Sequence, residues 1–308
     1  MNERIVAIST SSFARVDRRP LERLAAAQYT VRTNPHGRTL SHDETAALLA
    51  GAVGLIAGTE TLDRALFAQA TSLRVISRCG AGLDNVDLAA AAALGIVVRS
   101  VARAHVQAVA ELTLAGILDV LRHLARGDRS IRAGAWEKPM GSLLTGKTVG
   151  IVGLGRTGKA LVRLLEPFSV SLLATDPVED AVFAAAFGVQ YRALGELLQA
   201  SDIVTLHLPY GEAVHHLLDR DRLAAMKPGA ALVNTARGGL VDEAALAEAL
   251  AAGQLSGAYL DVFEREPYAG PLTVCETALL TPHVGSSAAE ARAAMELEAV
   301  ENLLEALG

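Results

Sequence analysis

Cysteine and aromatic residues are scarce in this sequence. Its 308 residues include two cysteines, Cys79 and Cys275, and only 4% aromatic side chains. Two cysteines are too few for a disulfide framework, and they lack the spacing of a metal site, so we expect two reduced thiols. Alanine supplies much of the apolar fraction instead, which favours many closely packed helices.

Long hydrophobic runs and excess positive charge are also absent. The N-terminal MNERIVAIS lacks the apolar stretch of a signal peptide, and no window reaches the roughly 18 to 20 apolar residues of a membrane span. The net charge of −6 gives no reason to expect nucleic acid or an anionic membrane as a partner. With 51% hydrophobic and 20% charged residues, the chain is expected to be globular, soluble and cytoplasmic.

Short apolar runs alternate with helical patterns almost from end to end. Strands are predicted at Ile5–Ser9, Gly54–Ala57, Leu73–Ser77, Ile96–Arg99, Thr148–Val152, Ser171–Ala174, Ile203–His207, Ala231–Asn234, Ala258–Val262 and Leu279–Thr281. Such alternation predicts parallel sheets with helices on both faces, and the length allows two domains. In the helical stretch DEAALAEALAAG, Asp242 is the expected N-cap and Gly253 the expected C-terminal stop.

One long helical segment, about residues 106 to 125, divides this alternation. It is apolar on most of its surface, which suits either a buried spine or an arm packed on another subunit. We therefore place one domain before this helix and a second domain from the helix onward. The C-terminal helix, residues 288 to 307, has no strand to serve and is expected to return to the first domain.

A glycine-rich turn follows one of the predicted strands and opens a helix. Gly153, Gly155 and Gly158 have the G-x-G-x-x-G spacing, and Arg156 and Thr157 stand inside it. The first glycine permits a tight turn, the second lets a pyrophosphate approach the backbone, and the third allows close helix–strand packing. The motif predicts a dinucleotide site, and a glycine-rich turn without a ligand is the alternative.

The next predicted strand leads into Asp176, 18 residues after Gly158. An acidic residue at about this spacing binds the ribose in dinucleotide-binding domains. Its carboxylate would repel a 2′-phosphate, so we expect NAD as the cofactor. A solvent-facing helix cap before Pro177 is the alternative.

A second turn, from Arg78 to Asp84, also follows a predicted strand. It lacks a third glycine at the fingerprint spacing, so a second nucleotide site is not expected. Consecutive backbone N–H groups at Gly80, Ala81 and Gly82 can form an anion-binding nest, which would suit a substrate carboxylate. An ordinary tight turn explains the same residues.

Three ionisable residues each follow an apolar run in the last quarter of the chain. Arg237, Glu266 and His283 come after the runs AALVN, GAYLDV and LLT. Because the carboxyl ends of parallel strands face one crevice, these side chains are expected to converge. Histidine can exchange a proton with an alcohol, a carboxylate supports the imidazolium, and arginine grips a substrate carboxylate. Taken singly, Arg237 could be a surface charge, Glu266 a turn residue and His283 a buried imidazole.

The segments around these residues have a specific likeness. LVNTARGGLVDEAALAEAL, GAYLDVFEREP and TPHVG closely resemble the signatures of the D-isomer-specific 2-hydroxyacid dehydrogenases, as do GIVGLGRTGKAL and GAGLDNVDLAAAAALGIVV. The resemblance implies that Arg237 binds the substrate, that His283 is the acid–base and that Glu266 pairs with His283. It also implies that Asp261 holds the nicotinamide carboxamide. Further cofactor-binding positions would be Leu208, Thr235, Ala236 and Gly285.

The resemblance also implies an architecture. The fold would comprise two Rossmann-like, doubly wound parallel-sheet domains. Residues 1–98 and 286–308 would form a flavodoxin-like substrate-binding domain, and residues 99–285 an NAD-binding domain. Such enzymes are usually homodimers, with the long helix in the interface.

The substrate is less defined than the reaction. The nearest likeness is to phosphoglycerate dehydrogenases, through GLDNVD and the arginines Arg78 and Arg122, and no C-terminal regulatory domain is expected. Gly58, however, stands where an arginine often faces the substrate phosphate, and His105 stands where an asparagine is common. Glyoxylate, hydroxypyruvate and lactate-type acids are therefore alternatives. A nucleotide-sensing interaction protein, like the family's corepressors, is an alternative of another class, which turnover of NADH with a 2-keto acid would exclude.

Overall fold

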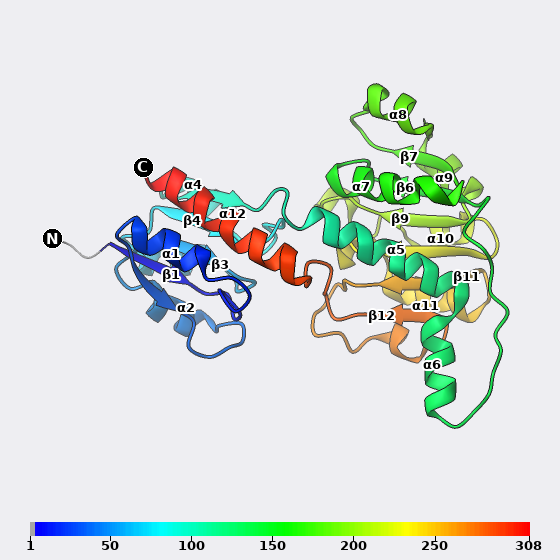
Figure 1. Cartoon of the computed structure of the whole chain (residues 1–308), viewed down its shortest axis with the longest axis horizontal. Coiled ribbons are helices and arrows are strands. Elements are labelled where there is room, and N and C mark those ends of the chain that lie inside the picture. Colours follow the sequence, from blue (N-terminus) through cyan, green and yellow to red (C-terminus); the bar gives the residue numbers. More distant parts are fainter. Residues whose placement is uncertain (1–3) are drawn as a thin grey trace. The chain divides into compact units, whose positions relative to one another are not determined.

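The computed structural model describes residues 4–308, which form two compact units (Figure 1). One unit comprises the chain up to His105 together with Ser287–Gly308, and the other comprises Val106–Ser286. Each unit contains one parallel sheet and its own helices, so the predicted α/β fold class is confirmed. Over the described residues, no helix combines the length and apolarity needed to cross a membrane.

The first unit contains a five-stranded sheet in the order β2-β1-β3-β4-β5, which is the flavodoxin-like order. Its strands are β1 Ile5–Ile8, β2 Thr30–Thr33, β3 Ala52–Ala57, β4 Val75–Arg78 and β5 Val97–Ser100. Its helices are α1 Arg19–Ala26, α2 His42–Leu49, α3 Arg64–Gln69, α4 Leu88–Ala93 and α12 Ala289–Leu307. Within β1, Val6 and Ile8 belong to one hydrophobic cluster and Ala7 to another, so the sheet is buried on both faces.

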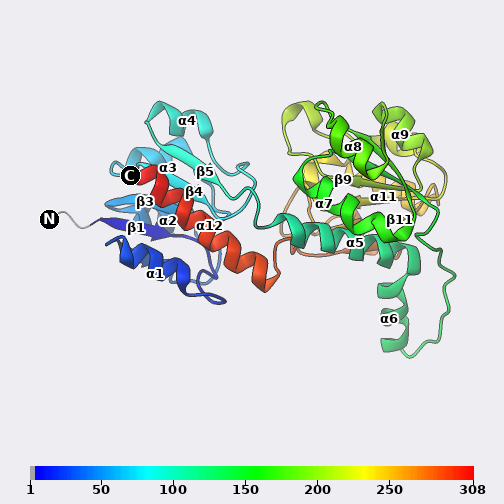
Figure 2. The same cartoon turned by 45° about the horizontal axis from the view of Figure 1, so that its top comes forward.

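Helix α12 brings the end of the chain back to this first unit. It packs on β3, β4, β5 and α1, and Figures 1 and 2 show it in red beside them. The approach is close, because a side chain at Gly54 would meet the Cδ1 atom of Leu303 at 3.0 Å. The Ser77 hydroxyl on β4 also donates to the Ala299 carbonyl, at 2.7 Å. Apolar packing and a buried hydrogen bond therefore hold α12 on the sheet.

The second unit contains a seven-stranded sheet in the order β12-β11-β10-β9-β6-β7-β8. Counted from β6, this is the dinucleotide-binding order extended by one strand. Its strands are β6 Thr148–Val152, β7 Ser171–Thr175, β8 Val189–Tyr191, β9 Ile203–Leu206, β10 Ala230–Asn234, β11 Leu255–Leu260 and β12 Ala278–Leu280. Its α-helices are α5 Val106–Arg122, α6 Leu124–Arg132, α7 Arg156–Leu165, α8 Ala181–Phe187, α9 Leu194–Ala200, α10 Arg220–Ala225 and α11 Glu243–Ala251.

The strand order reverses between β6 and β9, which are neighbours in this sheet. Ligands of open α/β sheets bind outside the carboxyl ends of the strands at such a point. The glycine-rich turn follows β6, and the segments after β9, β10, β11 and β12 leave the same edge of the sheet. A ligand-binding site is therefore expected at this edge of the sheet.

All ten predicted strands occur, and residues 4–308 contain two further strands that were not predicted. The two strands that were not predicted are β2 and β8, and each lies at an edge of its sheet. Their sequences, TVRT and VQY, include polar residues and so lack a continuous apolar run. The predicted cap and stop of α11 are confirmed: the Asp242 side chain accepts from the Ala245 amide at 2.9 Å, and Gly253 has a φ of +70°.

The long predicted helix, 106–125, is shorter than expected. Helix α5 ends at Arg122, and His123 has a left-handed φ of +56° before α6 begins at Leu124. The Asp119 carboxylate accepts from the Ala125 amide at 2.7 Å, which caps the start of α6. A local side-chain cap thus competes with continuation of the helix, and the periodicity does not reveal it.

Candidate active site

Arg237, Glu266 and His283 follow three neighbouring parallel strands. They come after β10, β11 and β12, in that order, and these strands lie side by side in the sheet. The side chains of Glu266 and His283 are about half exposed, and Arg237 is partly buried. One edge of one sheet therefore carries a cation, a carboxylate and an imidazole.

Glu266 and His283 form a direct pair. The His283 Nδ1 atom lies 2.9 Å from the Glu266 Oε2 atom, and the other Glu266 oxygen accepts from the Phe263 amide at 3.1 Å. Burial would raise the pKa of the Glu266 carboxyl, but the His283 hydrogen bond and charge, the Phe263 amide and the Arg237 charge outweigh it and lower that pKa. Glu266 is therefore a carboxylate at neutral pH, and the Nε2 atom of His283 is left for a substrate.

The turn that carries Arg237 is held by a buried asparagine. Asn234 is fully buried at the end of β10, its amide nitrogen donates to the Arg237 carbonyl at 2.8 Å, and its amide oxygen accepts from the Ala236 amide at 3.0 Å. Gly238 must lack a side chain, because a Cβ atom there would lie 1.8 Å from the Phe263 carbonyl carbon. The Arg237 turn thus packs directly on the loop that carries Glu266.

The loop that carries His283 is held by Asp261. This carboxylate is buried, and it accepts from the Val284 amide at 2.8 Å, the Gly285 amide at 2.7 Å and the Thr281 hydroxyl at 2.5 Å. His283 itself has a φ of +53°, which is costly for a residue other than glycine. The hydrogen bonds of Asp261 on both sides of His283 stabilise this conformation.

The fingerprint glycines separate into two kinds. A Cβ atom at Gly153, whose φ is +96°, would lie 2.8 Å from the His207 carbonyl oxygen, and one at Gly158 would lie 2.5 Å from the Gly153 oxygen. The fold itself therefore requires both glycines. A Cβ atom at Gly155 would meet nothing within 4 Å, so that glycine leaves open space at the N-terminus of α7. These residues fit a dinucleotide pyrophosphate.

The other predicted cofactor-binding residues lie around this turn or along the same edge. Arg156 and Thr157 begin α7, and Leu208 follows β9, with its Cδ2 atom 2.9 Å from a Cβ position at Gly153. Thr235 and Ala236 follow β10, and the Thr235 hydroxyl contacts that of Thr113 on α5 at 2.8 Å.

Asp176 is joined to the fingerprint turn. It follows β7, and its carboxylate accepts from the Leu154 amide at 2.8 Å and from the Val178 amide at 2.9 Å. The carboxylate thus binds the backbone of the turn and is not a simple solvent-facing cap. Its place beside Gly155 is the one expected for a ribose-binding acid.

Apart from Arg237, which is in the second unit, the predicted substrate-binding residues belong to the first unit. Arg78 ends β4, and the turn Gly80–Gly82 follows it. A Cβ atom at Gly80 would lie 2.0 Å from the Arg78 Nη1 atom, so the Arg78 guanidinium lies directly against Gly80. Gly58 and His105 are in this unit too, and Gly58 comes directly after β3.

A buried acid beside Gly58 escaped the sequence analysis. Glu60 is only 2% exposed, and its Oε1 atom accepts from the Ser9 hydroxyl and, at 3.2 Å, from the Gly58 amide. In the described part of the chain, the Glu60 Oε2 and Thr10 Oγ1 atoms are buried without a hydrogen-bond partner. Ser9 and Thr10 follow β1, and Gly58 and Glu60 follow β3, so this acid sits at the carboxyl edge of the first sheet.

Comparisons with known proteins agree with these features. Residues 114–285 match the model of the D-isomer specific 2-hydroxyacid dehydrogenase, NAD binding domain. The chain is 39% identical over 241 residues to D-3-phosphoglycerate dehydrogenase of Mycobacterium leprae, covering 77% of this chain and 46% of that protein. It is 38% identical over 243 residues to hydroxypyruvate reductase of Thermotoga maritima, and the match covers 77% of this chain and 78% of that protein. The crystal structure of the TT0316 protein from Thermus thermophilus superposes with a TM-score of 0.90 and is 37% identical in sequence. The superposition covers 98% of this chain and 96% of that chain.

Fold, fingerprint and strand-end residues together define a two-unit, dinucleotide-binding α/β protein. The chain belongs to the D-isomer specific 2-hydroxyacid dehydrogenase family and contains its NAD-binding domain. It spans about half the length of the phosphoglycerate dehydrogenases that it matches.

Proposed function

We propose that this chain catalyses hydride transfer between NAD and a D-2-hydroxy acid, or the reverse reaction from NADH to a 2-keto acid. The observation that carries the proposal is the 2.9 Å pair of His283 and Glu266 at the sheet edge that also bears Arg237. Family membership supports the same reaction.

The residues around the fingerprint turn would hold the cofactor. Gly155 gives the pyrophosphate access to the N-terminus of α7, and the Asp176 carboxylate beside that turn would bind the ribose and repel a 2′-phosphate. When bound, NAD supplies the acceptor or donor of the hydride.

His283 would transfer the proton. With Nδ1 bonded to Glu266, the Nε2 atom removes the hydroxyl proton during oxidation and returns it during reduction. The Glu266 carboxylate stabilises the imidazolium that forms. Arg237 would bind the carboxylate and the reacting oxygen of the substrate and so fix the orientation of the reacting carbon. Arg78 and the backbone of Gly80–Gly82 would contribute to binding of the substrate carboxylate.

We further propose that the substrate is a small unphosphorylated acid of the glyoxylate or hydroxypyruvate type. The Glu60 carboxylate sits at the carboxyl edge of the first sheet, next to the side-chain-free Gly58. A negative group repels a phosphate.

A panel of 2-keto acids, followed by NADH absorbance, tests both proposals. We expect hydroxypyruvate or glyoxylate to exceed phosphohydroxypyruvate in kcat/KM by at least about tenfold, because repulsion of about 1.4 kcal/mol has that effect. In Glu60→Gln, which keeps the shape and removes the charge, we expect this ratio to fall about tenfold. Glu22→Gln, an exposed acid on α1, should keep the wild-type ratio.

The outcomes of this panel are distinct. No NADH consumption with any acid would contradict the dehydrogenase and favour a nucleotide-sensing interaction protein. Turnover with an unchanged ratio in Glu60→Gln would contradict only the role of Glu60. A preference of the wild type for phosphohydroxypyruvate would assign the chain to phosphoglycerate oxidation instead.

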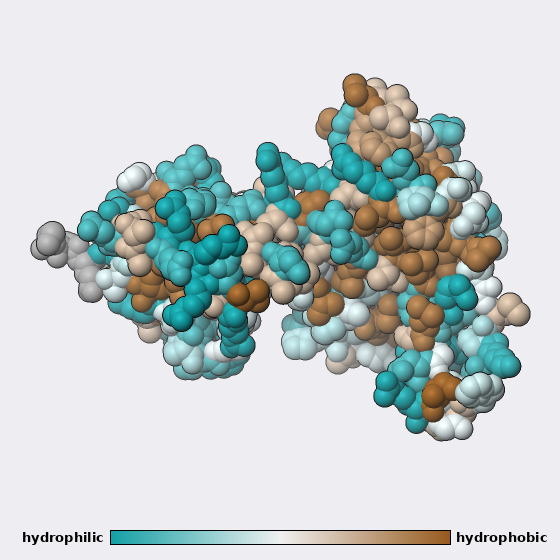
Figure 3. Space-filling view, in the orientation of Figure 1, coloured by the Kyte–Doolittle hydropathy of each residue, from teal (hydrophilic) through white to brown (hydrophobic). Residues whose placement is uncertain are grey.

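We also propose that the chain forms a homodimer through α5, α6 and the loop after α6. Figure 3 shows apolar side chains gathered over α5 and α7 on one face of the second unit. Large apolar side chains are also exposed along residues 124–143, namely Leu124, Ile131, Trp136, Met140 and Leu143. Such a surface fits a second copy of the chain.

Sedimentation equilibrium tests the dimer and should give twice the 32.1 kDa mass of one chain. The double substitution Trp136→Ser with Met140→Ser should lower the measured mass toward that of one chain. A wild-type mass of one chain would refute the dimer.

A further inference from the structure

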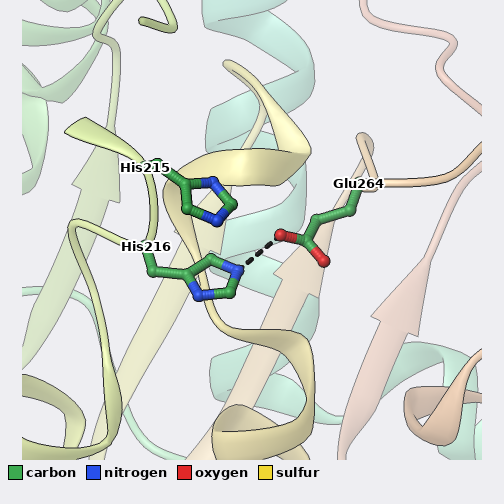
Figure 4. Close-up of side chains that lie close together, drawn as sticks. All are labelled: His215, His216 and Glu264. Carbon is green, nitrogen blue, oxygen red and sulfur yellow. Dashed lines mark hydrogen bonds and ion pairs between the residues drawn. The ribbon is translucent and has the colours of Figure 1, made fainter. Parts of the chain in front are cut away.

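A second group of ionisable side chains lies at the same edge of the second sheet, apart from Arg237, Glu266 and His283. His215 and His216 come after β9, and Glu264 is in the loop after β11 (Figure 4). One ligand atom from each residue lies within 4.8 Å of the other two. His215 and Glu264 are exposed and His216 is partly exposed, so an ion can reach them from solvent.

We propose that His215, His216 and Glu264 form a binding site for a divalent transition-metal ion of the zinc class. Two imidazole nitrogens and one carboxylate oxygen are a donor set that zinc accepts, with water completing a tetrahedron. The two imidazoles favour a transition metal over magnesium or calcium, which prefer oxygen ligands alone.

The hydrogen bonds of the first histidine suit a metal ligand. The Nδ1 atom of His215 is 3.0 Å from the Tyr210 hydroxyl, which leaves its Nε2 atom for the ion. In metal sites the second ring nitrogen of a histidine ligand usually has such a hydrogen-bond partner, which orients the ring. The rings of His215 and His216 stack, with centroids 3.9 Å apart, so the two imidazoles are neighbours, and the rings must splay for their in-plane nitrogen lone pairs to meet at one ion.

His216 and Glu264 need only a small movement to take up an ion. Their Nε2 and Oε1 atoms are 2.5 Å apart in a direct pair. Two donors on one tetrahedral zinc ion are roughly 3.4 Å apart, so the pair must open by about 1 Å. Both side chains are about one-third exposed, which leaves room for that movement.

Backbone contacts hold the two halves of the group in place. The His216 amide donates to the Gly239 carbonyl at 2.8 Å, and the Glu264 amide donates to a Glu243 oxygen at 2.8 Å. A bound ion would therefore join the segment after β9 to the loop after β11. Because Glu266 is two residues beyond Glu264, the ion would tie down the loop that bears the partner of His283.

Isothermal titration of the full chain with zinc chloride tests this site. We expect one zinc ion per chain, with affinity at least about tenfold weaker in His216→Ala and in Glu264→Gln. His36→Ala is the matched control, because it removes another histidine–carboxylate pair, His36 with Glu44 at 3.5 Å, and should leave the affinity unchanged. His283→Asn should also bind zinc as the wild type does, which separates this site from the Glu266–His283 pair.

The result is independent of the proposed reaction, because it requires no turnover. A wild-type chain that binds no zinc would overturn the proposal. So would zinc affinity that is unchanged in both His216→Ala and Glu264→Gln, or zinc affinity that is lost in His283→Asn. Circular dichroism of each variant, matched to the wild type, shows that a lost affinity reflects lost ligands and an intact fold.

Discussion

His283→Asn is expected to lower kcat by about 10²- to 10⁴-fold, the usual contribution of a general acid–base. Asparagine can still form a hydrogen bond, but it cannot accept and return a proton at neutral pH. NADH affinity should stay within a factor of about two, because nothing in the fingerprint turn changes. Stopped-flow reduction of a 2-keto acid gives the rate, and isothermal titration with NADH gives the affinity.

The control for this prediction is a second histidine that contacts a carboxylate. His42 in the first unit lies 3.2 Å from Asp63, and His42→Asn should leave kcat unchanged. Glu266→Gln should give an intermediate loss, because the imidazole remains while the charge that supports its protonated form is removed. Turnover near the wild-type rate in His283→Asn would remove His283 from proton transfer.

The central strands could be predicted from the sequence because they are buried on both faces. All four residues of β9 and all five of β10 are buried, and all of them except Thr205 and Asn234 are apolar. The edge strands β2 and β8 contain exposed residues, and no local apolar run marks them. Strand–helix alternation gave the fold class, and a local apolar run marked the strands that could be predicted, including the edge strands β5 and β12.

The positions of Arg237, Glu266 and His283 after strands could likewise be predicted. The contacts that hold these three residues in place could not be predicted, because they join segments that are far apart in the sequence. Asp261 contacts the Gly285 amide across 24 positions of the chain, and Gly238 packs on the backbone of Phe263. The likeness to known dehydrogenases suggested a cofactor contact for Asp261, and the structure adds three hydrogen bonds that hold the His283 loop.

Two groups left no signal in the sequence at all. In the sequence, Glu60 looks like an ordinary residue of a turn. It is buried because Ser9, 51 positions earlier, lies at the end of the adjacent strand. His216 and Glu264 are 48 positions apart and meet because β9 and β11 end at one edge of the sheet. Both groups result from the strand order, which no local pattern specifies.

Arg237→Ala is expected to lower kcat/KM by about 10³-fold, with both a lower kcat and a higher KM. Loss of a bidentate, charged contact to the substrate weakens binding and also frees the reacting carbon to rotate away from His283. Arg237→Lys keeps the charge but not the two parallel donors, so we expect a loss of about 10²-fold. Initial rates over a range of keto-acid concentrations at saturating NADH separate the two constants.

Local structure should survive this substitution. The Arg237 turn is held by Asn234 and by the close contact of Gly238, and neither requires the guanidinium. Arg222→Ala, which removes an exposed arginine of α10, is the control and should change neither constant. If Arg237→Ala raised KM and left kcat intact, the guanidinium would serve binding alone and would not orient the reacting carbon. Unchanged values of both constants would place substrate recognition elsewhere and exclude the proposed role of Arg237.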